Sequence, residues 1–284
     1  MTDELAIRTM SLQDMGVAVE WAASEGWNPG LADAHCFHRT DPEGFLIGEL
    51  DGLPVSCISV VRYGGGFGFL GFYIVKPEFR GRGFGWKTWL AGLDHLVDRN
   101  IGLDGVIDQQ DNYRKSGFAL AHRNIRYQGL TGTVMPGNTE GLVIQNDADW
   151  NSDLLDYDRQ FFPEDRELFI RGWCVEADHK VAVVLERDRI AGYGVIRPCR
   201  NGYKVGPLFA DTERAALALL HELTDCVEPD KPFFLDVPEP NSEAMELAQS
   251  LGMKSVFETA RMYSVKDPEL PLDRIYGITT FELG

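Results

Sequence analysis

Apolar residues change from a strand-like to a helix-like pattern within one stretch of this chain. Residues 69–75 (FLGFYIV) form an apolar run rich in aromatic and β-branched side chains, which predicts a buried strand. Pro77 ends this strand because proline has no N–H to donate to a neighbouring strand. Apolar residues spaced as on one face of an amphipathic helix follow at Trp86, Trp89, Leu90, Leu93 and Leu96. A glycine-rich loop, residues 80–85, connects the strand to this helix.

Similar patterns place the other elements of the first half. Asp51-Gly52 lies between two apolar runs, which predicts a hairpin of strands 45–50 and 54–61. Ser11 predicts the cap of a helix that runs to about Ser24. The remaining predicted elements are strand 5–8, a short helix over 31–37, strand 102–107 and strand 124–127.

The second half repeats this order in reduced form. Residues 181–196 predict another hairpin, 203–210 a central strand and 211–223 its helix, but no glycine loop joins the last two. Ala248 stands at the position that Tyr113 holds in the first half. A segment rich in Gly, Pro and Thr, 131–139, separates the halves, and 284 residues exceed what one core usually holds. We therefore predict an α/β protein with a mixed sheet and two domains, residues 1–133 and 134–284.

The loop between the predicted strand and helix suits an anion. The first N–H groups of a helix lack partners within it and carry the positive end of the helix dipole, and glycines let a phosphate approach them. Two common phosphate loops do not fit. Gly85 is followed by Trp86 and Lys87, whereas a nucleoside-triphosphate loop needs Gly-Lys-Ser/Thr. The glycines at 81, 83 and 85 alternate, whereas a dinucleotide loop follows G-x-G-x-x-G.

Residues 75–85, VKPEFRGRGFG, resemble the acetyl-CoA signature of the GNAT superfamily of N-acetyltransferases. The resemblance implies that acetyl-CoA is the co-substrate, with its pantetheine arm along the central strand and its pyrophosphate in the loop. An amide near Ile74 would then stabilise the oxyanion of the reaction. The coenzyme-binding residues that the resemblance implies are Tyr73, Ile74, Val75, Arg80, Gly81, Arg82, Gly83, Phe84, Gly85 and Trp86.

Residues 112–118, NYRKSGF, resemble the Y-x-x-x-G-F segment of the same superfamily. The resemblance implies that Tyr113 is the general acid that protonates the departing thiolate of coenzyme A. The second half has lost both the glycine loop and this tyrosine, so we predict one active site per chain. The whole chain resembles the YitH-type subset of GNAT proteins, which carry a second, degenerate GNAT-like domain.

The implied reaction transfers an acetyl group from acetyl-CoA to the primary amine of a small molecule or an amino acid. Two alternatives remain open: the acceptor is a protein N-terminus or lysine, or the chain is a non-catalytic acyl-CoA sensor. Because Tyr113 persists in the first half, the catalytic alternatives are favoured.

The general base is not fixed by any motif, because the central strand has no acid between Gly68 and Lys76. Asp104 is our first candidate, and Asp108, Glu25 and Glu49 are alternatives. Asp104 has a counterpart, Asp236, in the half without the loop, as a structural residue would. Trp27 and Asp236 are candidate residues of the acceptor pocket.

Composition excludes some partners. The chain has 27 basic and 44 acidic residues, a net charge of −17, which argues against binding to nucleic acid or to anionic membranes. The 5 cysteines lie far apart and suggest reduced thiols in the cytoplasm. No apolar run suggests an export signal or a membrane span. His35 and His38 lack a third ligand nearby, so no metal is expected.

Overall fold

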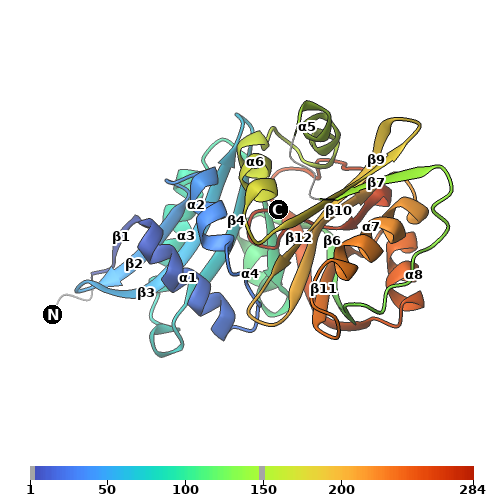
Figure 1. The fold of residues 1–284 in the computed structure, drawn as a ribbon. Helices are drawn as coiled ribbons and strands as arrows, with labels where there is room; N and C mark the ends of the chain where they lie inside the picture. Colours follow the sequence, from blue (N-terminus) through green and yellow to red (C-terminus); the bar gives the residue numbers. More distant parts are fainter. Residues whose placement is uncertain (1–3, 147–150) are drawn as a thin grey trace.

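The computed structural model describes residues 4–146 and 151–284; residues 1–3 of the first predicted domain and 147–150 of the second lie outside the described ranges. One mixed sheet runs through the molecule, with helices on both of its faces (Figure 1). Its strand order is β1-β2-β3-β4-β5-β12-β6-β11-β10-β9-β8-β7, and β13 pairs with β10. The predicted α/β class with a mixed sheet is confirmed.

The first half contains these elements: β1 (Ala6–Thr9), α1 (Leu12–Ser24), α2 (Asp33–Thr40), β2 (Phe45–Leu50), β3 (Leu53–Tyr63), β4 (Phe67–Val75), η1 (Pro77–Phe79), α3 (Phe84–His95), β5 (Asn100–Val106), η2 (Ile107–Gln109), α4 (Gln110–Lys115) and β6 (Ala119–Leu130). The second half contains β7 (Leu142–Asn146), α5 (Ser152–Asp158), η3 (Arg159–Phe161), α6 (Glu167–Val175), β8 (Lys180–Glu186), β9 (Arg189–Pro198), β10 (Tyr203–Ala210), α7 (Glu213–Asp225), β11 (Pro232–Pro238), α8 (Ser242–Ser250), β12 (Lys254–Tyr263), η4 (Leu272–Arg274) and β13 (Ile275–Gly277).

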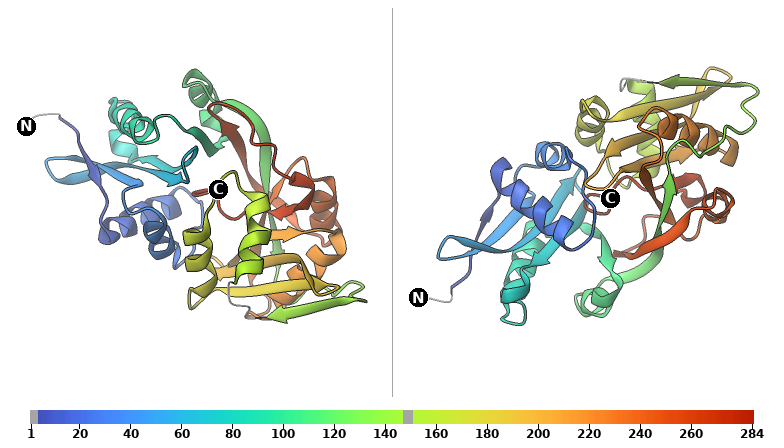
Figure 2. Two further views of the ribbon diagram at one scale, coloured as in Figure 1. Left: turned by 90° about the horizontal axis from the view of Figure 1, so that it is seen from above. Right: turned by 60° about the horizontal axis from the view of Figure 1, so that its bottom comes forward.

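The two halves exchange one strand each. β12, from the second half, pairs antiparallel with β5 of the first half. β6, from the first half, lies between β12 and β11, and it pairs antiparallel with both (Figure 2). Each strand of the first half therefore has an equivalent in the second half at the same position counted from the opposite edge of the sheet. β6 and β12 are also equivalent, but each lies beside strands of the other half. The predicted domain boundary after residue 133 falls in the connection between β6 and β7.

Three apolar cores follow from this arrangement. Helices α3 and α4 cover one face of the first half, where Trp89 and Tyr113 pack with residues of β3, β4 and β5. Helices α7 and α8 cover the matching face of the second half. A central core joins α1, α2, α5 and α6 to strands of both halves and to the segment 278–284. No helix in the described part of the chain is both long and apolar enough to cross a membrane.

Local sequence accounts for several boundaries. Helix α1 begins where it was predicted, because Ser11 and Asp14 form a reciprocal capping box. Helix α2 starts at Asp33, later than the predicted 31, and the Asp33 carboxylate accepts a hydrogen bond from the Gly30 N–H at 2.8 Å. Strand β6 is longer than the predicted 124–127 because both of its edges are paired. The elements that were not predicted include β7, α5, α6, β12 and β13.

Candidate active site

Strands β4 and β5 separate beside the predicted coenzyme arm. They pair in parallel only from Phe67 opposite Asn100 to Leu70 opposite Leu103. At Phe72, φ is +43°, and the β3–β4 register shifts there, as in a β-bulge. From Gly71 onward β4 keeps β3 as its only partner among the described strands. Its other edge is therefore open to an extended ligand that pairs with a strand backbone.

The glycine loop leads directly from this open edge into α3. Gly81 and Gly83 have φ values of +75° and +83°, which favour glycine, and an added Cβ at either would meet nothing within 4 Å. Gly83 is the residue before α3, and no side chain caps the first amides of this helix. The loop thus presents uncapped helix amides beside open space, which is the arrangement that binds a phosphate.

Neighbouring side chains hold the loop in place. The Arg80 Nε donates to the Val75 carbonyl at 2.8 Å, and its guanidinium also bonds Glu25. A Cβ at Gly85 would lie 2.8 Å from the Tyr73 Oη and 2.9 Å from a Val75 methyl, so this glycine lets α3 pack closely against β4. The other predicted loop residues remain at the surface or against each other: Arg82 lies over the Phe84 ring, with 4.9 Å between guanidinium carbon and ring centroid, and Trp86 is 57% exposed.

Tyr113 lies where β5 departs from β4. Its side chain is buried, and its ring centroid lies 5.6 Å from that of Trp89, which in turn lies 5.2 Å from that of Tyr73. A Cβ at Gly105 would collide with the Tyr113 ring. Burial raises the pKa of the Tyr113 hydroxyl above its usual value, and it raises that of Tyr73 to about 12. Both hydroxyls therefore keep their protons at neutral pH, as a proton donor requires.

Asp104, the first candidate for the base, is fully engaged in a structural ion pair. Its two carboxylate oxygens accept hydrogen bonds from Arg261 at 2.8 and 2.6 Å, and Asn124 donates a third at 2.7 Å. The side chain has no exposed surface. This geometry favours a structural role, so we withdraw Asp104 as the proton acceptor. The sequence argument from its counterpart in the second half agrees with this correction.

Of the other three acids considered as bases, two are bound to arginines and one is exposed to solvent. Glu25 is bound to Arg80, and Glu49 accepts from Arg8 on the sheet edge. Asp108 is exposed in η2.

The two candidate acceptor residues, Trp27 and Asp236, meet at a single arginine. Arg126 donates to both oxygens of Asp236, at 2.6 and 2.8 Å, and to the Trp27 carbonyl at 2.9 Å. Lys204 donates to the same carbonyl at 3.1 Å. The structure therefore brings these residues together at the junction of the halves, with the Asp236 carboxylate already paired.

The second half lacks the corresponding open features. β13 pairs with β10 at Leu208 and Phe209, and Ile278 donates to the Asp236 carbonyl of β11 at 2.9 Å. In the second half, β13 and Ile278 thus fill the space between β10 and β11. The equivalent space between β4 and β5 in the first half is open. The Thr212 side chain caps α7 by accepting from the Ala215 N–H. A free phosphate loop exists in the first half alone among the described residues.

Sequence reasoning missed Glu282, a buried acid in the central core. Its backbone lies against β4, because a Cβ at Gly71 would collide with the Glu282 carbonyl oxygen. No motif marks this position. The one available signal was the family resemblance of the segment around it.

Comparisons with known proteins agree with this architecture. A model of the acetyltransferase (GNAT) family matches residues 11–118, and a second model, described as an acetyltransferase (GNAT) domain, matches residues 154–277. A holothin acyltransferase from Pseudoalteromonas sp. is 28% identical over 276 residues, which cover 96% of this chain and 92% of the relative.

Two solved structures show the same fold. A putative acetyltransferase from Pyrococcus horikoshii superposes with a TM-score of 0.82 at 21% identity, over 100% of this chain and 97% of its own. A tandem GNAT protein from the clavulanic acid biosynthesis pathway superposes with a TM-score of 0.63 at 14% identity, over 92% and 98% of the two chains. These comparisons do not test the YitH-type assignment, which stays a prediction. The chain belongs to the GNAT acyltransferases and carries two GNAT domains in tandem.

Proposed function

We propose that this protein transfers the acetyl group of acetyl-CoA to the primary amine of a small molecule or an amino acid. One observation carries the proposal: the open edge of β4, the uncapped start of α3 and the buried side chain of Tyr113 converge in the first half. The described part of the second half, which shares the fold, has none of the three.

The residues present fit the coenzyme. Glycines at 81 and 83 leave room beside the first amides of α3, which suits a pyrophosphate. The β4 backbone from Tyr73 to Val75 offers hydrogen-bonding groups to a pantetheine arm. An amide near Ile74 would polarise the thioester carbonyl, and Tyr113 would donate its proton to the leaving sulfur.

Further support comes from the relative whose name describes an acyl transfer to holothin. We extend only the acyl transfer to this chain. We place the acceptor at the junction of the two halves, where Arg126 and Lys204 both donate to the Trp27 carbonyl, and we expect a small amine there rather than a protein chain. The wide spacing of the 5 cysteines along the chain also supports the expectation of a cytoplasmic protein.

The first test is calorimetric titration with acetyl-CoA of the wild type and of a Gly83→Trp variant. Gly52→Trp is the matched control, because Gly52 has a similar φ of +79° and equally open space but lies in the β2–β3 hairpin. A free-thiol assay over a panel of amines and amino acids follows. Micromolar binding that is lost only at Gly83, with thiol release for some amine, supports the transferase. Binding without turnover would favour the sensor, and no binding in the wild type would refute the proposal.

A further inference from the structure

Glu282 carries a buried carboxylate without a hydrogen-bond partner. The residue is 2% exposed, and both of its carboxylate oxygens lack a partner among the described residues. The other buried acids in the described ranges differ from it, because each pairs with an arginine: Asp33 with Arg197, Asp104 with Arg261, Asp158 with Arg166 and Asp236 with Arg126. An unpaired buried carboxylate destabilises a fold, so its presence calls for a functional reason.

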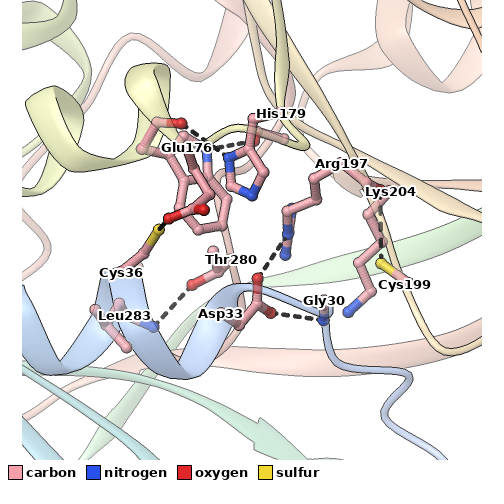
Figure 3. A network of polar contacts seen from close by, with 12 residues as sticks. Gly30, Asp33, Cys36, Glu176, His179, Arg197, Cys199, Lys204, Thr280 and Leu283 are labelled. Carbon is pink, nitrogen blue, oxygen red and sulfur yellow. Dashed lines mark hydrogen bonds and ion pairs between the residues drawn. The ribbon is translucent and has the colours of Figure 1, made fainter.

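The charged groups that face Glu282 come from four elements: Asp33 of α2, Arg126 of β6, Arg197 of β9 and Lys204 of β10. Each has another partner. Arg126 binds Asp236, and Lys204 donates to the Trp27 carbonyl. Arg197 binds Asp33 through its Nε, while its two terminal nitrogens have no hydrogen-bond partner among the described residues. Figure 3 shows Asp33, Arg197 and Lys204 directed toward one another beside Thr280 and Leu283. These groups therefore balance the charge of Glu282 from a distance, while its two buried oxygens keep no hydrogen-bond partner among the described residues.

The Glu282 backbone lies beside the residue of β4 at which the pairing with β5 ends. That residue is Gly71, the first of β4 beyond the part paired with β5. The β4 residues Phe69 and Phe72 point into the central core with the segment 278–284. Tyr73 and Tyr113 belong to the core on the opposite face of the sheet. The Glu282 backbone and the Tyr113 side chain thus lie on opposite faces of the sheet beside β4.

We propose that the Glu282 carboxylate binds the acceptor's ammonium group and takes its proton. This inference rests on the proposed function and supplies the base that the sequence did not reveal. One proton passes from the ammonium nitrogen to Glu282, which leaves a neutral amine. The amine nitrogen forms a bond to the thioester carbon, and the carbon–sulfur bond then breaks. The sulfur takes the Tyr113 proton, the second nitrogen proton restores the tyrosine hydroxyl, and Glu282 releases its proton to solvent.

The pH dependence of stability follows from the same carboxylate. Burial raises the pKa of Glu282 above its ordinary value of 4.5, although Lys204 opposes this rise. A group with a raised pKa in the folded state contributes less stability as the pH rises through that pKa. Glu282→Gln removes the charge while keeping the shape. The variant should therefore melt at least about 2 °C above the wild type at pH 8, and the two should melt together below pH 4.5.

The experiment compares the wild type, Glu282→Gln and the control Glu258→Gln, whose carboxylate lies at the surface in an ion pair with Arg123. Acetyl-CoA binding is measured by calorimetry, melting by circular dichroism, and kcat/KM against pH with the best amine of the panel. We expect unchanged coenzyme binding in all three. For Glu282→Gln we expect a fall in kcat/KM of about 100-fold or more and a pH profile displaced toward alkaline values, since the amine must then lose its proton in solution.

Two results would overturn the role of Glu282 alone: full turnover in Glu282→Gln, or a lower melting temperature of this variant at pH 8, which would reveal a structural ion pair. A wild type that binds no acetyl-CoA, or uses no amine, would instead refute the proposed function, and this proposal with it. The melting comparison needs no acceptor, so the two kinds of failure remain distinct.

Discussion

Among single residues, the clearest pattern is a pair of matching ion pairs. Asp104 on β5 lies directly opposite Arg261 on β12, and Asp236 on β11 lies directly opposite Arg126 on β6. In each pair the arginine belongs to the exchanged strand. The two aspartates that the sequence repeat aligns therefore fasten the two halves together.

Asp104→Asn should destabilise the protein by about 3–5 kcal/mol, because it leaves the buried guanidinium of Arg261 without its counter-charge. Asp236→Asn should cost a similar amount for the same reason. Urea denaturation measures both. A catalytic base at Asp104 would show a different result, namely a loss of kcat at unchanged stability.

Tyr113→Phe should lower kcat by about 10²- to 10⁴-fold, which is the usual contribution of a general acid. The ring contact with Trp89 survives, so calorimetry should show unchanged binding of acetyl-CoA. Tyr127→Phe is the control, since Tyr127 is equally buried but its hydroxyl contacts the Met245 sulfur in the core of the second half. Equal turnover of the two variants would contradict the assigned role.

At the level of elements, two glycines with the same left-handed backbone conformation test the phosphate loop. Gly83 and Gly52 have φ values of +83° and +79°, and neither has an atom near an added Cβ. Alanine at either position should destabilise by about 1–2 kcal/mol, the cost of a left-handed residue. Gly83→Ala alone should also raise the KM for acetyl-CoA, because it shifts the first amides of α3. A similar KM in both variants would argue against a phosphate at this loop.

The strand, loop and helix around Gly83 could be predicted because their signals are local. Pro77 ends the strand, the glycines set the loop, and the apolar spacing marks one face of α3. The places of β6 and β12 could not be predicted, since they depend on pairing between residues more than 100 positions apart, such as Asn124 and Thr259. Glu282 could not be predicted for a related reason, because the absence of a hydrogen-bond partner for its carboxylate is visible only in the folded structure.

At the scale of the whole molecule, the strand exchange makes the halves depend on each other. Without β12, the β5 edge would be exposed, and without β6, β11 would lose a partner along its whole length. Residues 1–133 and 134–284 expressed separately should therefore be insoluble or unfolded. Co-expression of the two pieces should restore soluble protein and coenzyme binding, as checked by size-exclusion chromatography and calorimetry. A folded, monomeric first piece would refute this interdependence.

The exchange of β6 and β12 also sets the order of events during synthesis on the ribosome. The strand that completes the catalytic half, Lys254–Tyr263, emerges only after strands β7 to β11 of the second half have been made. Until β12 is made, one edge of β5 remains unpaired, although the phosphate loop and Tyr113 have already been synthesised. A nascent chain of this protein therefore cannot acquire its catalytic half early and its second half later. The active site matures only after β12 has been made, and a chain that stops before Lys254 leaves an exposed strand edge for the cell's chaperones and proteases.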